Sequence, residues 1–309
     1  MAMLAPVLAI AAGCAEPRAV ASGARTDVTT PVGQSTVRAP GTGNAPKPVV
    51  VAAALEAHAA EVARGCRPGM VMIEGRYCID RYEGSLVEVM PSGEERPFSP
   101  FTSPGKEQSV RAVSEPSVYP QGYISAVQAQ QACVASGKRL CKVSEWQQAC
   151  RGPEKVRYGY SEQREVGRCN DNGRSPVIRL FGHRFDSATM NQPELNQLAG
   201  TLTKTGERSA CTNGYGVHDM VGNLHEWVAD PDGTFYGGYY QDVTSYGHGE
   251  GCEYKTKAHE ARYHDYSTGF RCCAEPLGSE TIVSVSPGIT PPPITATPRP
   301  RTKAPRRRK

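Results

Sequence analysis

Cysteine is the residue type in this chain with the widest chemistry, because its thiolate can attack a substrate, bind a metal or join a second cysteine. The 309-residue sequence contains 11 cysteines, of which Cys14 stands apart near the N-terminus and ten lie between Cys66 and Cys273. None of the ten belongs to a CxxC pair, the spacing that brings two ligands to one ion in most zinc sites. Ten cysteines of this kind predict five disulfides formed in an oxidising compartment.

Motifs for other kinds of catalysis are missing from the sequence. It has no G-x-S-x-G motif, no phosphate-binding glycine loop, and no free cysteine spaced to pair with a histidine. Its glycine-rich stretches have the composition of turns. The sequence therefore gives no support to nucleophilic or nucleotide-dependent catalysis.

Two short helices are predicted in the middle of the chain, and the first covers residues 123–137. Ser125 and Gln128 have the spacing of a capping box, and Gly137 is a favoured helix stop. Cys133 shares the face of the small apolar residues of this helix, so we expect it to point inward.

The second helix is predicted to begin at Ser144, with Gln147 completing another capping box, and to end at Gly152. Trp146 and Cys150 fall on its apolar stripe, so this cysteine should also point inward. The rest of the chain is rich in Gly, Pro, Asn and Tyr, which predicts short strands and long irregular loops supported by disulfides and bound ions.

The N-terminal 65 residues differ in composition from the middle of the chain. Residues 1–14 form a short apolar run that ends in small residues before Cys14. This pattern predicts an export signal, with Cys14 as the lipidated residue of a bacterial lipoprotein. Residues 15–65 are rich in Ala, Pro, Gly, Ser and Thr and predict a flexible tether, with a short amphipathic helix possible at 49–64.

The C-terminal segment, residues 278–309, is proline-rich and basic. From Ile282 onward it carries seven positive residues and no acidic one, so the net charge of +4 becomes −3 without it. Such a disordered tail attracts polyanions, for example at a cell envelope, or serves only to keep the protein in solution. It lacks the interleaved aromatic residues of a nucleic-acid module, and we expect no specific nucleic acid as a partner.

Four stretches of sequence together resemble the formylglycine-generating enzyme, or sulfatase-modifying factor, family. They read GMVMIEGRYCIDRYEGS at 69–85, YISAVQAQQACVASGKRLCKVSEWQQACRG at 123–152, NGYGVHDMVGNLHEWV at 213–228 and GFRCC at 269–273, and the Gly-Gly pair at 237–238 stands between the last two. The resemblance implies one domain over residues 66–277. Its implied fold is an irregular α/β domain related to C-type lectins, rich in disulfides and low in regular secondary structure.

The resemblance also implies part of the disulfide pattern. The two disulfides of the family fall on Cys133 with Cys272 and on Cys150 with Cys252. The other six cysteines allow fifteen connectivities, and Cys272 and Cys273 could exchange partners. Proximity in the sequence favours the following pairs: Cys66 with Cys78, Cys141 with Cys273, and Cys169 with Cys211.

A calcium site of the family maps onto Asp219, Gly222, Leu224 and Glu226, where two carboxylates and two backbone carbonyls would supply hard oxygen ligands. A second family site could begin at Asn170. The alternative for the first site is an ordinary polar turn that leads into a tryptophan packed in the core.

The catalytic cysteine pair of the family, which binds copper(I), has no counterpart here. The stretch from Gly238 to Gly251 contains no cysteine, and Asp242, Tyr246 and His248 stand near the vacated positions. Because copper(I) requires soft thiolate ligands, we expect neither copper binding nor formylglycine synthesis.

Iron is the alternative, since some branches of the family are non-haem iron enzymes that use histidine and carboxylate ligands. His248, His259, His264 and Asp265 could converge, although no tight H-x-x-x-H or H-x-D pair is present. In this alternative the protein is a metal-dependent oxidoreductase. His225 is expected at the surface or behind the ligands.

The favoured interpretation is an exported, calcium-stabilised binding module for an extracytoplasmic protein, peptide or other surface ligand. Tyr239, Tyr240 and Tyr246 would offer flat contact area beside the family's groove. We expect the protein in the bacterial envelope, as a periplasmic or outer-membrane lipoprotein, or secreted. Membrane contact would be made only through the lipid anchor.

Overall fold

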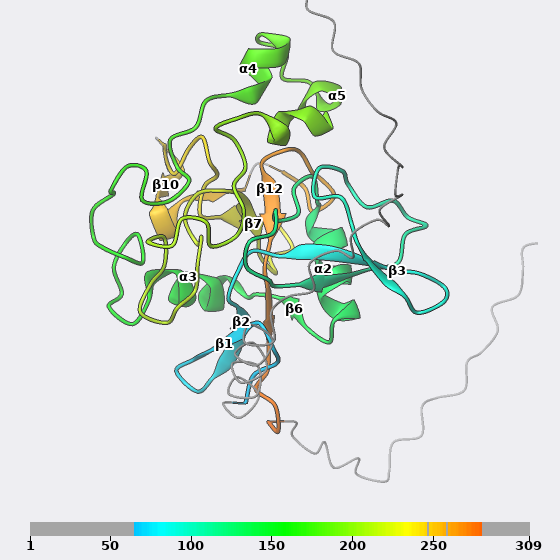
Figure 1. Cartoon of the computed structure of the whole chain (residues 1–309). Helices are drawn as coiled ribbons and strands as arrows, with labels where there is room; N and C mark the ends of the chain where they lie inside the picture. Colours follow the sequence, from blue (N-terminus) through cyan, green and yellow to red (C-terminus); the bar gives the residue numbers. More distant parts are fainter. Residues whose placement is uncertain (1–64, 246, 258, 280–309) are drawn as a thin grey trace, which may run out of the picture. The chain divides into compact units, whose positions relative to one another are not determined.

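Short elements and long connections make up the part of the chain that the computed structural model describes, residues 65–245, 247–257 and 259–279 (Figure 1). The helices are α2 (Ala126–Ala135), α3 (Val143–Arg151), α4 (Pro176–Phe181), α5 (Ser187–Met190) and the 3-10 turns η1 (Pro193–Gln197) and η2 (Gly251–Glu253). The strands are β1 (Met70–Ile73), β2 (Tyr77–Asp80), β3 (Ser85–Val89), β4 (Glu95–Pro97), β5 (Val110–Val113), β6 (Arg139–Leu140), β7 (His225–Trp227), β8 (Phe235–Tyr236), β9 (Thr244–Ser245), β10 (Gly249–Glu250), β11 (Lys255–Thr256), β12 (Thr268–Phe270) and β13 (Cys272–Ala274). This composition confirms the predicted class, an irregular α/β domain with many disulfides.

The first four-stranded sheet joins the beginning and the end of the domain, in the order β1-β2-β13-β6. Strand β13 lies antiparallel between β2 and β6, so that Cys272 faces Leu140 across the sheet. The backbone N–H of Leu277 donates to the carbonyl oxygen of Gly65 at 2.6 Å. The two ends of the described chain are therefore held side by side.

The second four-stranded sheet, in the order β11-β8-β7-β12, positions the loop that precedes β7. Strands β7 and β12 are parallel, with His225 opposite Thr268 and Trp227 opposite Phe270. Two smaller sheets, β4-β3-β5 and β10-β9, lie outside these two.

The first predicted helix is confirmed as α2. Ser125 is its N-cap, and its hydroxyl and the Gln128 side chain form the expected capping box. The chain leaves the helix through Gly137 at φ 66°, a left-handed conformation that favours glycine. Cys133 is fully buried.

The second predicted helix exists as α3, but its predicted N-terminus is wrong. The helix begins at Val143, and its N-cap is Lys142. The backbone N–H of Lys142 donates to the Glu145 carboxylate at 2.9 Å, so Glu145 rather than Gln147 occupies the third helical position of the cap. A carboxylate at this position also faces the positive end of the helix dipole. The helix ends at Arg151, before Gly152 at φ 69°.

Five disulfides join the described elements, and they are the same five pairs that the sequence analysis named: Cys66–Cys78, Cys133–Cys272, Cys141–Cys273, Cys150–Cys252 and Cys169–Cys211. Two of them attach α2 and the residue that follows β6 to strand β13. A third attaches α3 to η2.

Two tryptophans occupy separate parts of the core, and each has a partner for its indole N–H. Trp227 packs with Phe235 and Phe270 and donates to the carbonyl oxygen of Ile124 at 2.8 Å. Trp146, in the other large cluster, donates to the Glu226 carboxylate at 2.6 Å. This second bond draws Glu226 toward the core.

Several expectations concern segments outside the described residues. They are the signal segment with Cys14, the tether with its helix up to residue 64, Tyr246, and the tail from residue 280. Among the helices of the described residues, none has the length and apolar character needed to cross a membrane.

Candidate functional site

The loop from Asp219 to Glu226 makes a tight turn before β7. Asp219, Gly222 and Asn223 have φ values of 56°, 82° and 58°, all in the left-handed region. A Cβ atom on Gly222 would lie 2.3 Å from the carbonyl oxygen of Asn170, so this position requires glycine. The backbone N–H of Asn223 donates to the same carbonyl at 2.8 Å. Asn170 is thus packed directly against the loop.

Glu226 is committed to a buried ion pair. Both Nε and Nη2 of Arg271 donate to its two carboxylate oxygens at 2.6 Å, and Trp146 supplies a third bond. Side chains Arg271 and Glu226 are 0% and 1% exposed. The guanidinium also donates to the carbonyl oxygens of Asp80 and His218, at 3.0 and 2.9 Å. Such a pair is expensive to desolvate, and the hydrogen bonds from Arg271 and Trp146 compensate that cost.

Two more buried carboxylates surround the same guanidinium. Glu83 accepts from the side chain of Asn223 at 2.6 Å and from the backbone N–H of Leu224 at 3.1 Å. Burial and the nearby charges of Asp219 and Glu226 raise the pKa of Glu83 well above its ordinary value. Burial also raises the pKa of Asp219 to about 7. Three carboxylates thus face one guanidinium, and the excess negative charge favours either protons or a further cation.

The predicted calcium ligands have the negative charge that a cation requires, but only some of their oxygen atoms are free of other bonds. The Oδ2 atom of Asp219 accepts one bond, from the backbone N–H of Gly206 at 2.7 Å. Both oxygens of Glu226, by contrast, already accept bonds from Arg271. Among the described residues, no group of three or more His, Cys, Asp or Glu side chains could hold a metal ion.

Asn170, named for a second calcium site, is occupied by structural contacts. Its side-chain amide donates to the carbonyl oxygen of Thr201 at 2.9 Å and to Oδ1 of Asn223 at 2.8 Å. Its neighbour Asp171 is ion-paired with Arg164 at 2.7 Å. These bonds tie the segment to the Asp219–Glu226 loop.

Asp242 and His248, near the positions vacated by the copper-binding cysteines, each bond to other residues nearby in the chain. Asp242 accepts from the hydroxyl of Tyr254 at 3.0 Å and from the backbone N–H of Thr244 at 3.1 Å. His248 uses its Nδ1 atom to bond the Thr256 hydroxyl at 2.8 Å.

The residues named for an iron site are spread over different contacts. His264 bonds Asn191 at 2.8 Å, whereas His259 stacks on Tyr263 with ring centroids 3.7 Å apart. Asp265 is buried and accepts from the backbone N–H and the hydroxyl of Ser267, at 2.8 and 2.7 Å. Its carboxylate caps a turn of its own chain.

His225 is buried, so its predicted place at the surface is wrong. The ring packs against Phe235, Tyr239 and Tyr254, with centroid distances of 4.6, 4.8 and 5.5 Å. Burial lowers the pKa of His225 to about 3. Its Nδ1 atom accepts or donates no hydrogen bond among the described residues.

The tyrosines proposed to contact a ligand are mainly core residues, which corrects that expectation for Tyr240. Tyr240 is fully buried, and its hydroxyl donates to Asn196 at 3.1 Å. Tyr239 is half-buried against Tyr240 and Tyr266. The aromatic rings at this turn fill space between loops, so they offer little flat surface to a partner.

An apolar groove that the sequence analysis missed lies elsewhere, between α2, β6 and the segment that follows β7. It is open, has a volume of about 620 Å³, and is lined by Val127, Leu140, Val228 and Pro231 among others. Arg139 and Lys142 also line the groove, as does Asp230. Because its walls come from three distant segments, no periodic pattern in the sequence could reveal it.

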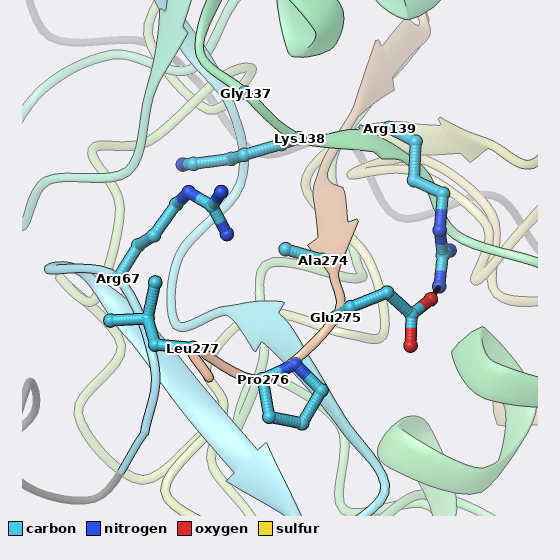
Figure 2. A pocket seen from close by; sticks show the side chains of 8 residues that line it. All are labelled: Arg67, Gly137, Lys138, Arg139, Ala274, Glu275, Pro276 and Leu277. Carbon is cyan, nitrogen blue, oxygen red and sulfur yellow. Dashed lines mark hydrogen bonds and ion pairs between the residues drawn. The ribbon is translucent and has the colours of Figure 1, made fainter. Parts of the chain in front are cut away.

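A smaller polar cavity of about 300 Å³ adjoins this groove and shares Arg139 with it (Figure 2). Figure 2 shows the Arg139 guanidinium pointing to Glu275, with which it pairs at 2.7 Å. Lys138, on another wall, pairs with Asp80 at 2.6 Å. These cations are already neutralised by carboxylates, so we assign no ligand to this cavity.

A family model described as "Sulfatase-modifying factor enzyme 1-like domain" matches residues 20–276. Two variants of the Major Tropism Determinant, P3c and I1, are 14% and 12% identical, with TM-scores of 0.41 and 0.39. Each match covers 69% of this chain and 54% of that protein.

The protein CarF is 22% identical, with a TM-score of 0.28 over 45% of this chain and 48% of its own. The chain therefore spans about half the length of these solved structures. No curated protein matches.

Proposed function

The chain belongs to the sulfatase-modifying factor enzyme 1-like family, and we propose that it serves as an extracytoplasmic binding module for a segment of another protein. The observation that carries the proposal is the open apolar groove on α2 and β6. Ligand sites are typically concave and apolar with a few polar groups at defined places, and this groove has that character.

The walls of the groove are rigid. Disulfides hold α2 and the end of β6 to strand β13, through Cys133–Cys272 and Cys141–Cys273. The backbone N–H of Leu140 donates to Gln130 at 2.9 Å, and that of Ala229 donates to the carbonyl oxygen of Cys141 at 2.8 Å. Because these groups are already ordered, a ligand would bind without the cost of ordering the walls.

The polar residues of the groove indicate the kind of segment it accepts. Val127, Leu140 and Val228 would enclose an apolar side chain. The side chain of Lys142 is 65% exposed, and its ammonium group lies 3.9 Å from the Glu145 carboxylate. The ammonium group can therefore also reach an acidic group on a ligand. We therefore propose an apolar anchor residue next to an acidic residue as the recognised feature.

We also propose that the Asp219–Glu226 loop binds calcium, through the Asp219 carboxylate and the carbonyl oxygens of Gly222 and Leu224. The excess of buried negative charge around Arg271 supports this proposal. Glu226 would have to share one oxygen between the ion and Arg271. The ion would act as a structural support, because the groove lies on other elements.

Loss of the redox cysteines supports a binding role over an oxidase role. All ten cysteines between Cys66 and Cys273 are joined in disulfides, and none is left to form a thiolate pair. Disulfides at this density are typical of exported proteins, which is the compartment we propose.

The binding proposal is tested by selecting from a library of random 12-residue peptides on immobilised protein, followed by fluorescence polarisation with the peptides obtained. We expect selected peptides to share an apolar anchor. The Val127→Asp variant should weaken their binding at least tenfold, because it places a charge in the groove. Val166→Asp, at an exposed apolar residue that does not line the groove, should bind as the wild type does.

A peptide that binds both variants equally well would contradict the groove as the site. The binding-only role is checked separately, by incubating the protein with a cysteine-containing peptide from a sulfatase. Conversion of that cysteine to an aldehyde would overturn it.

Calcium binding is tested by titration calorimetry at two pH values on metal-free protein. Because Asp219 has a pKa of about 7, the ion must displace a proton at lower pH. We expect affinity to fall about tenfold from pH 8 to pH 6. Asp219→Asn should abolish the heat of binding, and its persistence would reject Asp219 as a ligand.

A further inference from the structure

The segment from Arg174 to Ala188, here called the α4–α5 tip, carries several exposed apolar side chains within a short stretch of sequence. Seven large hydrophobic residues are exposed in the described part of the chain, and three of them lie between positions 178 and 185. Ile178, Leu180 and Phe185 are 44%, 42% and 51% exposed. A cluster of this kind in a well-folded protein marks an interaction surface more often than single exposed residues do.

The exposure is not a result of loose packing, because α4 has a second, buried face. Val177 is fully buried, and it packs with half-buried Phe181 against Leu195, Tyr240 and Tyr266. These contacts leave Ile178 and Leu180 with no role in holding the helix to the domain.

The connection between α4 and α5 is also well defined. Gly182 ends α4 at φ 63°, and the Asp186 carboxylate accepts from the backbone N–H of Thr189 at 2.9 Å at the start of α5. Phe185 precedes this cap and is therefore presented on an ordered turn.

Positive charge surrounds the exposed apolar residues. Arg174, Arg179 and Arg184 lie in the α4–α5 tip, with Asp186 as its only acidic residue. The Arg179 guanidinium donates to a backbone carbonyl, that of Ala199, at 2.8 Å, so its charge stays uncompensated. Arg184 forms an exposed ion pair with Asp186 at 3.5 Å, and Arg174 has no ion pair within the described ranges.

We propose that the α4–α5 tip docks on an anionic lipid bilayer, with Ile178, Leu180 and Phe185 entering the headgroup region and the arginines binding lipid phosphates. Apolar residues flanked by arginines are the combination that binds charged membrane surfaces. The tip stands at the margin of the domain in Figure 1, with α2 and α3 on other sides. A projecting surface can enter a fluid bilayer, whereas a protein partner would need a matching cavity.

This site is separate from the groove of the proposed function, so each can be present without the other. A protein docked in this way would keep the groove on α2 and β6 free for a ligand. The membrane contact requires no acyl chain.

The test uses the full chain with Cys14→Ser, so that no acyl chain can contribute, and measures sedimentation with sucrose-loaded vesicles. The vesicles contain phosphatidylcholine alone or with about a third phosphatidylglycerol. Leu180→Ser combined with Phe185→Ser should lower the partition coefficient on anionic vesicles about tenfold. This pair leaves the charge of the basic tail unchanged, so the tail cannot explain the loss.

The matched control replaces two apolar residues exposed elsewhere, Val134→Ser with Val166→Ser, and should bind within twofold of the parent. Arg179→Gln with Arg184→Gln should lower binding to anionic vesicles by roughly fivefold per arginine and should leave binding to neutral vesicles unchanged.

A second measurement does not depend on loss of binding. Phe185→Trp places an indole at the tip, and brominated lipids should quench its fluorescence when vesicles are added. Absence of quenching, or equal vesicle binding by the Leu180→Ser/Phe185→Ser variant, would overturn the proposal. If only the arginine variants lose affinity, and they lose it equally for polyglutamate, the tip is a site for acidic protein and the membrane proposal fails.

Discussion

At the scale of single residues, the most consequential contact is the buried pair of Arg271 and Glu226. The charge of Arg271 acts on Glu83, Asp219 and Glu226 together, and the guanidinium also binds two backbone carbonyls. A residue of a family motif can therefore be present in the sequence while its side chain forms structural bonds within the domain. In this chain the glutamate of the G-N-x-x-E-W stretch stabilises strand β12 against β7 and the first sheet.

Replacing Arg271 should lower the free energy of unfolding, because the buried carboxylates around it lose their compensating charge. Arg271→Met leaves three buried carboxylates without a guanidinium, so we expect a loss of about 3–5 kcal/mol in the free energy of unfolding by urea. Arg96→Ala removes an exposed pair with Glu94, whose side chains are 59% and 56% exposed, and should change stability by less than about 1 kcal/mol. Equal effects would contradict the assigned role.

His225 predicts a pH dependence of stability. Its folded pKa of about 3 lies below the ordinary value of 6.5, so the unfolded chain binds the proton more tightly. Stability should fall as the pH drops below 6.5, by up to about 1.4 kcal/mol per pH unit, and level off near pH 3. Burial of Asp219 acts in the opposite direction.

The effect of His225 is isolated by comparing the wild type with His225→Phe. The difference between their unfolding free energies should shrink or reverse in favour of the variant between pH 7 and pH 4. Parallel profiles in that range would show that His225 takes up its proton in the folded state as well.

At the scale of elements, the loop before β7 depends on close backbone contact with a segment about fifty residues earlier. Gly222 makes that contact possible, and the hydrogen bond from Asn223 to Asn170 fixes it. The Cys169–Cys211 disulfide lies beside the same contact. The loop is therefore positioned by packing, with or without an ion.

Two glycine substitutions separate the steric effect from backbone strain. Gly222 and Gly93 have nearly equal φ values of 82° and 83°, but a Cβ atom on Gly93 would meet nothing within 4 Å. Gly93→Ala should cost about 1 kcal/mol, and Gly222→Ala at least about 2 kcal/mol more. Thermal unfolding measures both, and similar losses would argue against the contact with Asn170.

At the scale of the whole described domain, two disulfides close nearly the same loop of the chain. Cys133–Cys272 and Cys141–Cys273 begin close together in the chain and end on adjacent residues. Once one of them has closed the long loop, the other closes only a short one. Their contributions to stability should therefore not add.

Removing the two pairs singly and together tests this redundancy. Loss of either pair alone should cost about 3 kcal/mol, the value for a loop of roughly ten residues. Loss of both should cost about 7 kcal/mol, because a loop of roughly forty residues, shortened by the intact Cys150–Cys252 bridge, is then released as well. Guanidinium unfolding of the three alanine variants gives the comparison, and a strictly additive result would contradict it.

The sequence by itself determined the features that depend on neighbouring residues or on family motifs. The capping box of α2, the inward cysteines, two of the disulfide pairs and the missing thiol pair follow from short spacings or from the resemblance to the family, whereas proximity in the sequence only favoured the other three pairs among fifteen connectivities. The predicted start of α3 was wrong even so: the helix begins at Val143 with Lys142 as its N-cap, because the Glu145 carboxylate accepts from the backbone N–H of Lys142.

Only the tertiary structure decided which partners the polar and aromatic residues take. Glu226 meets Arg271, Tyr240 enters the core, His225 is buried, and the groove forms from α2, β6 and the chain after β7. These outcomes depend on which distant surfaces pack together, and side-chain burial and charge compensation are set by that packing. No local pattern of residues encodes them.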